Sequence, residues 1–165
     1  MHVVTYDVRE IANLVIDIAQ GKNKTISNLT INKIVFFLHE KYLIEEGKPL
    51  VSAKIEAWKF GPVFRELYNE FKVFAEKPIT VKAKRFNPLN ARLEVCALDS
   101  GEQIGNNISG WCESLLELTP YQLVELSHAE GGAWDRTFNH GKGSNPGMEI
   151  TNQSILTAHQ GQFTQ

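Results

Sequence analysis

The segment Ile-Glu-Ala-Trp-Lys-Phe-Gly-Pro-Val, residues 55–63, constrains the fold more than any other part of the chain. It predicts an aromatic-rich extended strand that turns directly into a helix. Gly61 permits a tight turn because it has no Cβ to clash. Pro62 fits the first helical position, where its missing N–H is not needed. We therefore expect a helix from Val63 to about Phe74, with apolar side chains at helical spacing.

Four aromatic side chains belong to this segment and the helix after it, namely Trp58, Phe60, Phe64 and Tyr68. Their spacing favours a place in the core. Aromatic residues are also favoured at protein interfaces. Partial exposure of Trp58 or Phe60 would therefore indicate a binding site at the turn.

The length of 165 residues, with 42% hydrophobic and 22% charged residues, is typical of one globular domain. We expect that domain to span residues 1–160 and residues 161–165 to fray. The sequence shows neither an apolar signal core nor a run of about 18 apolar residues. We therefore expect a cytoplasmic chain with no membrane contact.

Two N-terminal helices are predicted from caps and apolar spacing. Asp7 and Glu10 form a capping-box pattern, and Gly21 fits the C′ position that closes the first helix. The second helix begins near Asn28 and ends before Gly47. It is apolar on more than one face, so we expect it to be central to the core.

A change to period two after Pro78 predicts a β-hairpin. Its strands would span residues 79–84 and 92–97, joined by a turn at residues 87–90. Because an isolated hairpin is barely stable in water, one face should lie on the helices. The other face would carry basic side chains.

The C-terminal half predicts further helices. Ser100 with Gln103 suggests a capping box, and Thr119 with Pro120 opens the next helix, from which Leu123 and Leu126 should point inward. A buried turn at 134–138, a loop at 139–147 and a short helix at 149–159 would follow. The fold class is mainly α (α+β), a compact domain of about five to six helices with a small β-hairpin.

Charge is unevenly distributed along the chain. The formal net charge of −2 argues against a nucleic-acid-binding module, which usually has a basic excess. A basic strip nevertheless occurs between residues 71 and 86, comprising Lys72, Lys77, Lys82, Lys84 and Arg85. It is interpreted either as a solvated, charged hairpin edge that discourages strand pairing or as a docking surface for a charged partner.

Catalytic and metal motifs are weak in this sequence. His128, Glu130 and Asp135 lie near Trp134 and could serve a metal-dependent hydrolase, although their spacing matches no usual ligand set. The alternative is that they cap helix ends and satisfy backbone donors. Cys96 and Cys112 do not form a Cys-x-x-Cys motif, and both are expected to be small buried hydrophobes. No cofactor is predicted.

Three segments taken together resemble the Panacea domain of SocA-type antitoxins. Residues 27–39 are similar to the family's Leu-x-Lys-Leu-Leu-Tyr-Phe helix, and residues 55–63 match its Glu-Ala-Trp-x-Tyr-Gly-Pro-Val stretch with Phe60 in place of Tyr. Residues 126–134 are similar to its Ser/Thr-His-x-Glu…Pro-Trp segment, with Ala133 in place of Pro. The motif positions are Glu56, Trp58, Gly61, Pro62, Tyr68, His128 and Trp134.

This resemblance implies a mainly helical, non-enzymatic antitoxin that binds and neutralises a toxin protein encoded beside it. Related genes occur in phage and mobile elements of bacteria. Some members are similar to protease adaptors that deliver the toxin to a Clp-type protease. The candidate residues for partner contact are Trp58, Lys59, Phe60, Lys82, Lys84 and Arg85.

Overall fold

A computed structural model describes residues 4–99, 103–141 and 148–162 of the chain. Within these ranges the protein forms seven α-helices, one short 3-10 helix and two antiparallel two-stranded sheets. The expected mainly α class is confirmed. The helix number exceeds the expected five to six because the predicted buried turn after Gly132 is a helix of its own. None of the helices in these ranges is long and apolar enough to cross a membrane.

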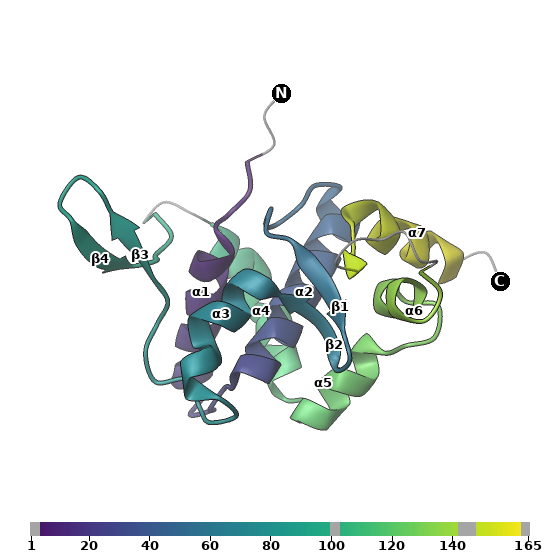
Figure 1. The fold of residues 1–165 in the computed structure, drawn as a ribbon, viewed down its shortest axis with the longest axis horizontal. Helices are drawn as coiled ribbons and strands as arrows, with labels where there is room; N and C mark the ends of the chain where they lie inside the picture. The colour runs from purple at the N-terminus through teal and green to yellow at the C-terminus, as the bar shows by residue number, and fades with distance from the viewer. Residues whose placement is uncertain (1–3, 100–102, 142–147, 163–165) are drawn as a thin grey trace.

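Helix α2 (Asn28–Glu46) is the centre of the fold, as expected. Figure 1 shows it in the middle of the molecule, and five other helices and strand β2 pack against it. Ser27 caps its first turn, and Gly47 ends it with a left-handed φ of 69°. Twelve of its residues are buried, which explains why its apolar residues do not form a single stripe.

Helix α1 (Val8–Gly21) packs beside α2 and is capped by Asp7, whose side chain accepts a bond from the Arg9 backbone N–H. The expected capping box does not form, because Glu10 pairs with Arg85 instead. Gly21 is not the C′ residue but the last helical residue. The positive φ falls on Asn23, at 54°.

The prediction of a strand that leads directly into a helix at Pro62 is wrong. Strand β1 (Ile55–Trp58) and strand β2 (Gly61–Phe64) form an antiparallel hairpin, so Pro62 lies opposite Ala57 inside a strand. Since β2 pairs only with β1, it is an edge strand, where proline is tolerated. Helix α3 (Arg65–Phe71) starts later and continues as the 3-10 helix η1 (Lys72–Phe74).

The second hairpin exists but is displaced from its predicted position. Strands β3 (Lys84–Asn87) and β4 (Arg92–Val95) are shorter than expected, and almost all their residues are exposed. Figure 1 shows the hairpin projecting from one end of the molecule. The expectation that one face lies on the helices is therefore wrong. Ile79 and Ala83, which were assigned to its first strand, lie in the segment that precedes β3, and both are buried.

The remaining helices cover the other sides of α2. They are α4 (Ile104–Leu116), α5 (Pro120–Ser127), α6 (Ala133–Phe138) and α7 (Asn152–Gln162). The capping box at Thr119 is confirmed, with Pro120 in the first turn of α5. Leu123 is fully buried as predicted, but Leu126 is 47% exposed and does not point inward. Ser100, half of the other expected box, lies outside the described residues, and Gln103 makes no side-chain cap bond.

Candidate partner-binding site

The β1–β2 turn is the structural centre of the site. Lys59 and Phe60 form a two-residue loop between the facing pair Trp58 and Gly61. Gly61 has a φ of 110°, which side chains rarely adopt, and a Cβ there would lie 2.5 Å from Ser127 Oγ and 2.6 Å from a Lys33 side-chain carbon. Glycine is therefore required by both backbone conformation and space.

A buried lysine supports the turn from below. The Lys33 side chain is completely buried in α2, and its ammonium donates a 3.0 Å bond to the Pro62 carbonyl. No described carboxylate pairs with it, and burial lowers the pKa of Lys33 to about 8. In the preceding position, Asn32 Oδ1 accepts a 2.9 Å bond from the Phe64 N–H. Adjacent residues of α2 thus hold both ends of β2.

A buried carboxylate fixes the indole of Trp58. Glu56 is 4% exposed and accepts a hydrogen bond of 2.7 Å from Trp58 Nε1. It also accepts two hydrogen bonds, of 3.0 and 2.8 Å, from the Arg65 guanidinium. The Arg65 hydrogen bonds lower the pKa of Glu56, so this carboxylate is ionised at neutral pH. Arg65 also lies 5.5 Å from the centre of the Trp58 ring.

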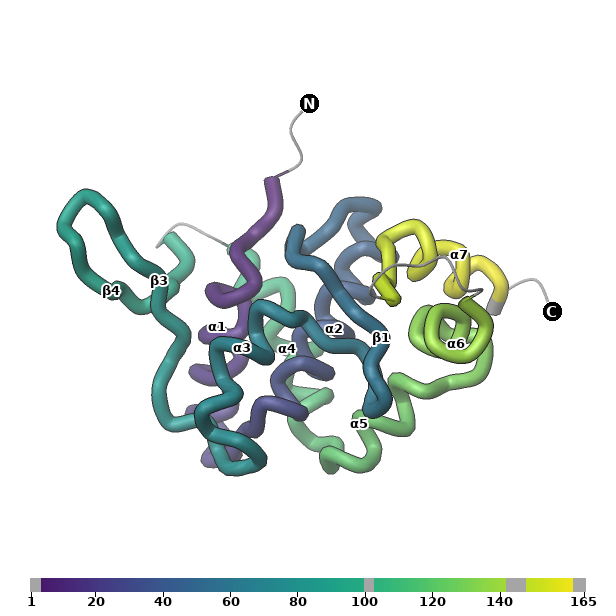
Figure 2. The backbone as a smooth tube through the Cα atoms, in the orientation of Figure 1, coloured from purple at the N-terminus to yellow at the C-terminus, as the bar shows by residue number. Residues whose placement is uncertain are grey.

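An aromatic stack closes the other side of β1. Trp134 Nε1 donates a hydrogen bond of 2.7 Å to the Trp58 carbonyl. The Trp134 ring stacks on the His128 ring, with centroids 3.7 Å apart, and on the Phe138 ring, with centroids 4.7 Å apart. Burial and the nearby Lys33 charge lower the pKa of His128, so its ring is neutral at neutral pH. Figure 2 shows the β1–β2 turn reaching α5, with α6 beside β1.

An apolar groove opens beside this supported turn. It has a volume of about 490 Å³, and we call it the aromatic groove after the residues Leu29, Trp58, Phe60 and Tyr68 that line it. Phe60 is 58% exposed, Leu29 40% and Tyr68 38%, whereas Trp58 is half-buried and packs edge-on against Tyr68 at 4.8 Å. A core position is confirmed for Phe64 and is wrong for Phe60 and Tyr68.

Comparison with known proteins places these residues in a family. Residues 31–135 match the domain described as Antitoxin SocA-like, Panacea domain, a range that includes both hairpins and Trp134. Antitoxin SocA of Caulobacter vibrioides (strain NA1000 / CB15N) is 35% identical over 144 residues, which cover 87% of this chain and 76% of that protein. The chain belongs to the SocA-like antitoxin family. No solved structure matches it significantly.

Membership of the SocA-like family supports an antitoxin role for this chain. The structure brings the three resembling segments together around one turn. Lys33 comes from the first segment, Gly61 and Pro62 from the second, and His128 and Trp134 from the third. Most of the family's motif residues in this chain therefore form a buried support, while Trp58 and Tyr68 line the groove beside it.

The three residues considered for a hydrolase take separate roles in this SocA-like chain. His128 stacks on Trp134, Glu130 is exposed, and Asp135 accepts bonds of 2.9 Å from the Gly131 N–H and 2.7 Å from the Asn139 amide. No group of three His, Cys, Asp or Glu in the described ranges could hold a metal ion. Asp135 serves the backbone, as the capping interpretation predicted.

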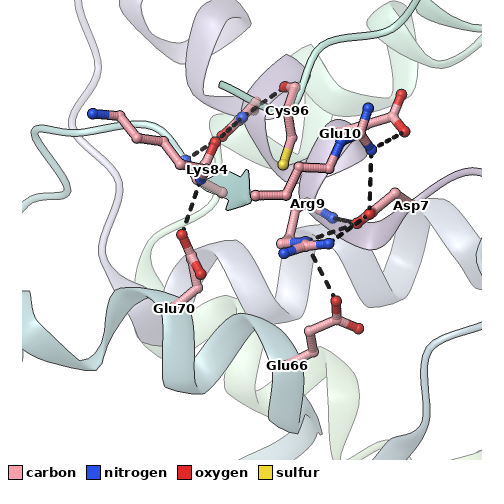
Figure 3. A network of polar contacts seen from close by, with 10 residues as sticks. Asp7, Arg9, Glu10, Glu66, Glu70, Lys84 and Cys96 are labelled. Atoms are coloured by element: carbon pink, nitrogen blue, oxygen red, sulfur yellow. Dashed lines mark hydrogen bonds and ion pairs between the residues drawn. The ribbon is translucent and has the colours of Figure 1, made fainter. Parts of the chain in front are cut away.

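The predicted basic surface is partly neutralised by the chain itself. Lys82 pairs with Asp17, and Arg85 pairs with Glu10 at 3.1 Å and Asp7 at 3.5 Å. Lys84 differs, because only its backbone N–H is bonded, to Glu70. Figure 3 shows the Lys84 side chain extending away from that carboxylate. Of these three side chains, Lys84 alone has no ion pair within the described part of the chain.

Several supporting residues were missed by sequence reasoning, namely Asn13, Asn32, Lys33, Arg65 and Ser127. For Asn13, Asn32 and Lys33 the signal was a polar side chain within an apolar helix. A polar residue at a buried position needs a partner, and here the partners are backbone groups of β2 and of the segments that flank the second hairpin. Arg65 bonds instead to the Glu56 carboxylate, and Ser127 to a carbonyl of its own helix. Both cysteines, by contrast, are free and buried as expected.

Proposed function

We propose that this chain neutralises a toxin protein by direct contact, without catalysing a reaction, and that the aromatic groove forms the centre of that contact. The observation that carries the proposal is the exposure of Phe60, Tyr68 and Leu29 around a groove beside the motif turn. Clustered exposed apolar side chains typically mark protein interaction sites. The cytoplasm is the compartment in which we expect this to happen.

The turn is suited to binding because it is already ordered. Phe60 stands at the tip of a loop whose flanking residues are fixed by Glu56, Lys33 and Trp134. An anchor held in place before binding loses little conformational entropy when the partner arrives. Aromatic anchors of this kind carry most of the energy in many interfaces.

The groove alone is too small to account for a stable complex. Stable interfaces bury roughly 1,600 Å² in total, so the contact must extend over the charged rim. Lys59, Lys72 and Glu76 lie at that rim. A polar rim around an apolar centre is the usual interface anatomy. Toxin neutralisation would then follow from covering the toxin's working surface.

The basic hairpin residues are assigned a smaller part. A toxin carboxylate that approached Lys82 or Arg85 would have to replace an existing ion pair, so little net energy would be gained. Lys84 has no such competitor and could steer an acidic partner. Charge reversal at Lys84 should slow association, while the same change at Lys82 should have less effect.

The proposal is tested with two phenylalanines of matched exposure. Phe60 is 58% exposed in the β1–β2 loop, and Phe86 is 60% exposed on β3. The product of the neighbouring gene would be purified, and its binding to wild type, Phe60→Ser and Phe86→Ser measured by calorimetry. We expect Phe60→Ser to weaken binding by roughly tenfold or more, with Phe86→Ser close to wild type.

The opposite ranking would overturn the assignment to the groove. Absence of any binding by the wild-type chain would overturn neutralisation by direct contact. Unfolding curves of both variants serve as the control, since neither side chain is buried and neither substitution should change stability by more than about 0.5 kcal/mol.

We also propose that the chain can act as a protease adaptor, because it has a second exposed apolar surface that is separate from the aromatic groove. Phe86, Leu89 and Leu93 are 60%, 95% and 67% exposed on hairpin β3–β4. An adaptor needs one surface for its cargo and another for the protease. The double change Phe86→Ser with Leu93→Ser should abolish toxin degradation by a purified Clp-type protease and leave neutralisation intact. Unchanged degradation would rule out this role for the hairpin.

A further inference from the structure

A second cavity lies at the other end of α2 from the aromatic groove. It has a volume of about 500 Å³ and is formed by α2, α4 and α7. Its apolar walls include Phe37, Ile44, Trp111 and Leu115. Cavities of this size commonly hold small organic groups in an apolar setting with a few polar contacts.

One carboxylate in this cavity has no partner among the described residues. Glu40 is half-buried on α2 and makes no hydrogen bond or ion pair with a residue of the described ranges. Burial raises its pKa to about 7. The neighbouring lysine does not compensate it, because Lys41 pairs with Glu45 and lies over the Trp111 ring, 4.9 Å from the centroid.

The charges around the cavity favour a cation. Glu40 and Glu45 contribute two carboxylates, Lys41 contributes one ammonium, and His159 is the remaining titratable lining residue. An uncompensated carboxylate in an apolar cavity is unfavourable, and a bound cation would remove that cost. The position of Lys41 shows that the Trp111 ring accepts an ammonium group on its face.

We propose that this cavity binds a primary ammonium group carried on a short apolar chain, with Glu40 as counter-ion and Trp111 and Leu115 in contact with the apolar chain. A free alkylamine and the lysine side chain of a partner share this chemistry. The site is independent of toxin binding at the groove, because Asn32 and Glu40 lie eight residues apart on α2, about 12 Å along the helix.

The test uses hexylammonium as the probe on the full chain, followed through the indole N–H resonance of Trp111. We expect a saturable shift for hexylammonium. Its neutral counterpart hexanol, and the variant Glu40→Gln with hexylammonium, should each bind at least about tenfold more weakly. Glu46→Gln is the matched control, since Glu46 is exposed at the end of the same helix and outside the cavity. Titration with Nα-acetyl-lysine methylamide then separates the two sources of the ammonium group.

Binding should strengthen as the pH rises through about 7, because Glu40 ionises over that range, and Glu40→Gln should remove most of that dependence. Equal affinity of Glu40→Gln and wild type, equal affinity for hexanol and hexylammonium, or no saturable shift would each overturn the proposal. Glu40→Gln also removes a buried charge, so it should fold normally and leave toxin binding unchanged.

Discussion

The two hairpins of this SocA-like chain share an antiparallel topology but lie in opposite surroundings. Strands β1 and β2 are buried along their length except at Trp58, whereas β3 and β4 are exposed at nearly every residue. The buried hairpin has no regular alternation of apolar and polar residues. The exposed hairpin places Phe86 opposite Leu93, and both side chains are exposed to solvent.

The difference lies in how each hairpin is attached. β1–β2 packs against α2, α5 and α6, and helix side chains bond to its strands at Trp58, Pro62 and Phe64. Within the described residues, the bonds that attach β3–β4 to the helices lie near its base, where Asn13 bonds to Ala83 and Cys96 and where Arg85 pairs with Glu10. Strand pairing alone therefore does not say whether a hairpin belongs to the core. The core hairpin is the one whose strands themselves, and not only their flanks, are bonded to helix side chains.

The largest effect is expected at the turn of the buried hairpin. Gly61→Val places a branched side chain at a φ of 110° and against Lys33 and Ser127, so it should lower the free energy of unfolding by at least about 4 kcal/mol. Urea unfolding measures this. A melting temperature equal to wild type would show that the turn is not the constraint we describe.

One asparagine attaches each hairpin, which gives a matched pair of variants. Asn32→Ala leaves the buried Phe64 N–H without its acceptor, and Asn13→Ala does the same to Ala83. Each should cost about 2–3 kcal/mol. Hydrogen exchange should then differ, because Asn32→Ala speeds exchange across α2, whereas Asn13→Ala speeds it mainly at 83–96. Identical exchange patterns would contradict the contrast.

Charge contributes more to the buried hairpin than to the exposed one. Since Glu56 has a lowered pKa in the folded protein, its stabilising effect is complete above its ordinary range and is lost as the pH falls from that range through the lowered pKa. Glu56→Gln should cost about 1–2 kcal/mol at pH 7 and much less near pH 3. Glu10→Gln, at the base of β3–β4, should cost under about 0.5 kcal/mol. Urea titrations at both pH values compare the two.

The smallest effect is expected in the exposed turn and has the opposite sign. Ala91 has a φ of 55°, a conformation that glycine adopts without strain. Ala91→Gly should raise the free energy of unfolding by roughly 0.5 kcal/mol, since relief of strain exceeds the added entropy of the unfolded chain. Thermal unfolding against wild type is sufficient, and a clear destabilisation would show that the exposed turn is not strained.

Local signals in the sequence predicted the helices well. The caps at Asp7 and Thr119 act within a few residues of the chain, so the sequence alone identifies them. The first strand of the exposed hairpin was misplaced because Ile79 and Ala83 are buried by distant partners. The Ile79 N–H bonds to the Ile26 carbonyl, and the Ala83 N–H bonds to Asn13. Burial of these two apolar residues gives the segment the alternating sequence pattern of a strand although it is not one.

The candidate site was only partly predictable. The family motif pointed to Trp58, Gly61 and Pro62, but it did not show that Pro62 lies in a strand or that Lys33 is buried beneath it. The sequence also did not predict which aromatic side chains are exposed, because Phe60 and Phe64 are the same residue type only four positions apart. One is at the tip of a loop and the other is fully buried. Only the tertiary packing separates them.

Amide hydrogen exchange of this chain, alone and saturated with its toxin, tests most directly which surface the toxin covers. The account predicts slower exchange at residues 58–60 and 68–76 around the aromatic groove, with exchange at 84–95 unchanged. Protection confined to 84–95, with 58–76 exchanging as in the free protein, would contradict it.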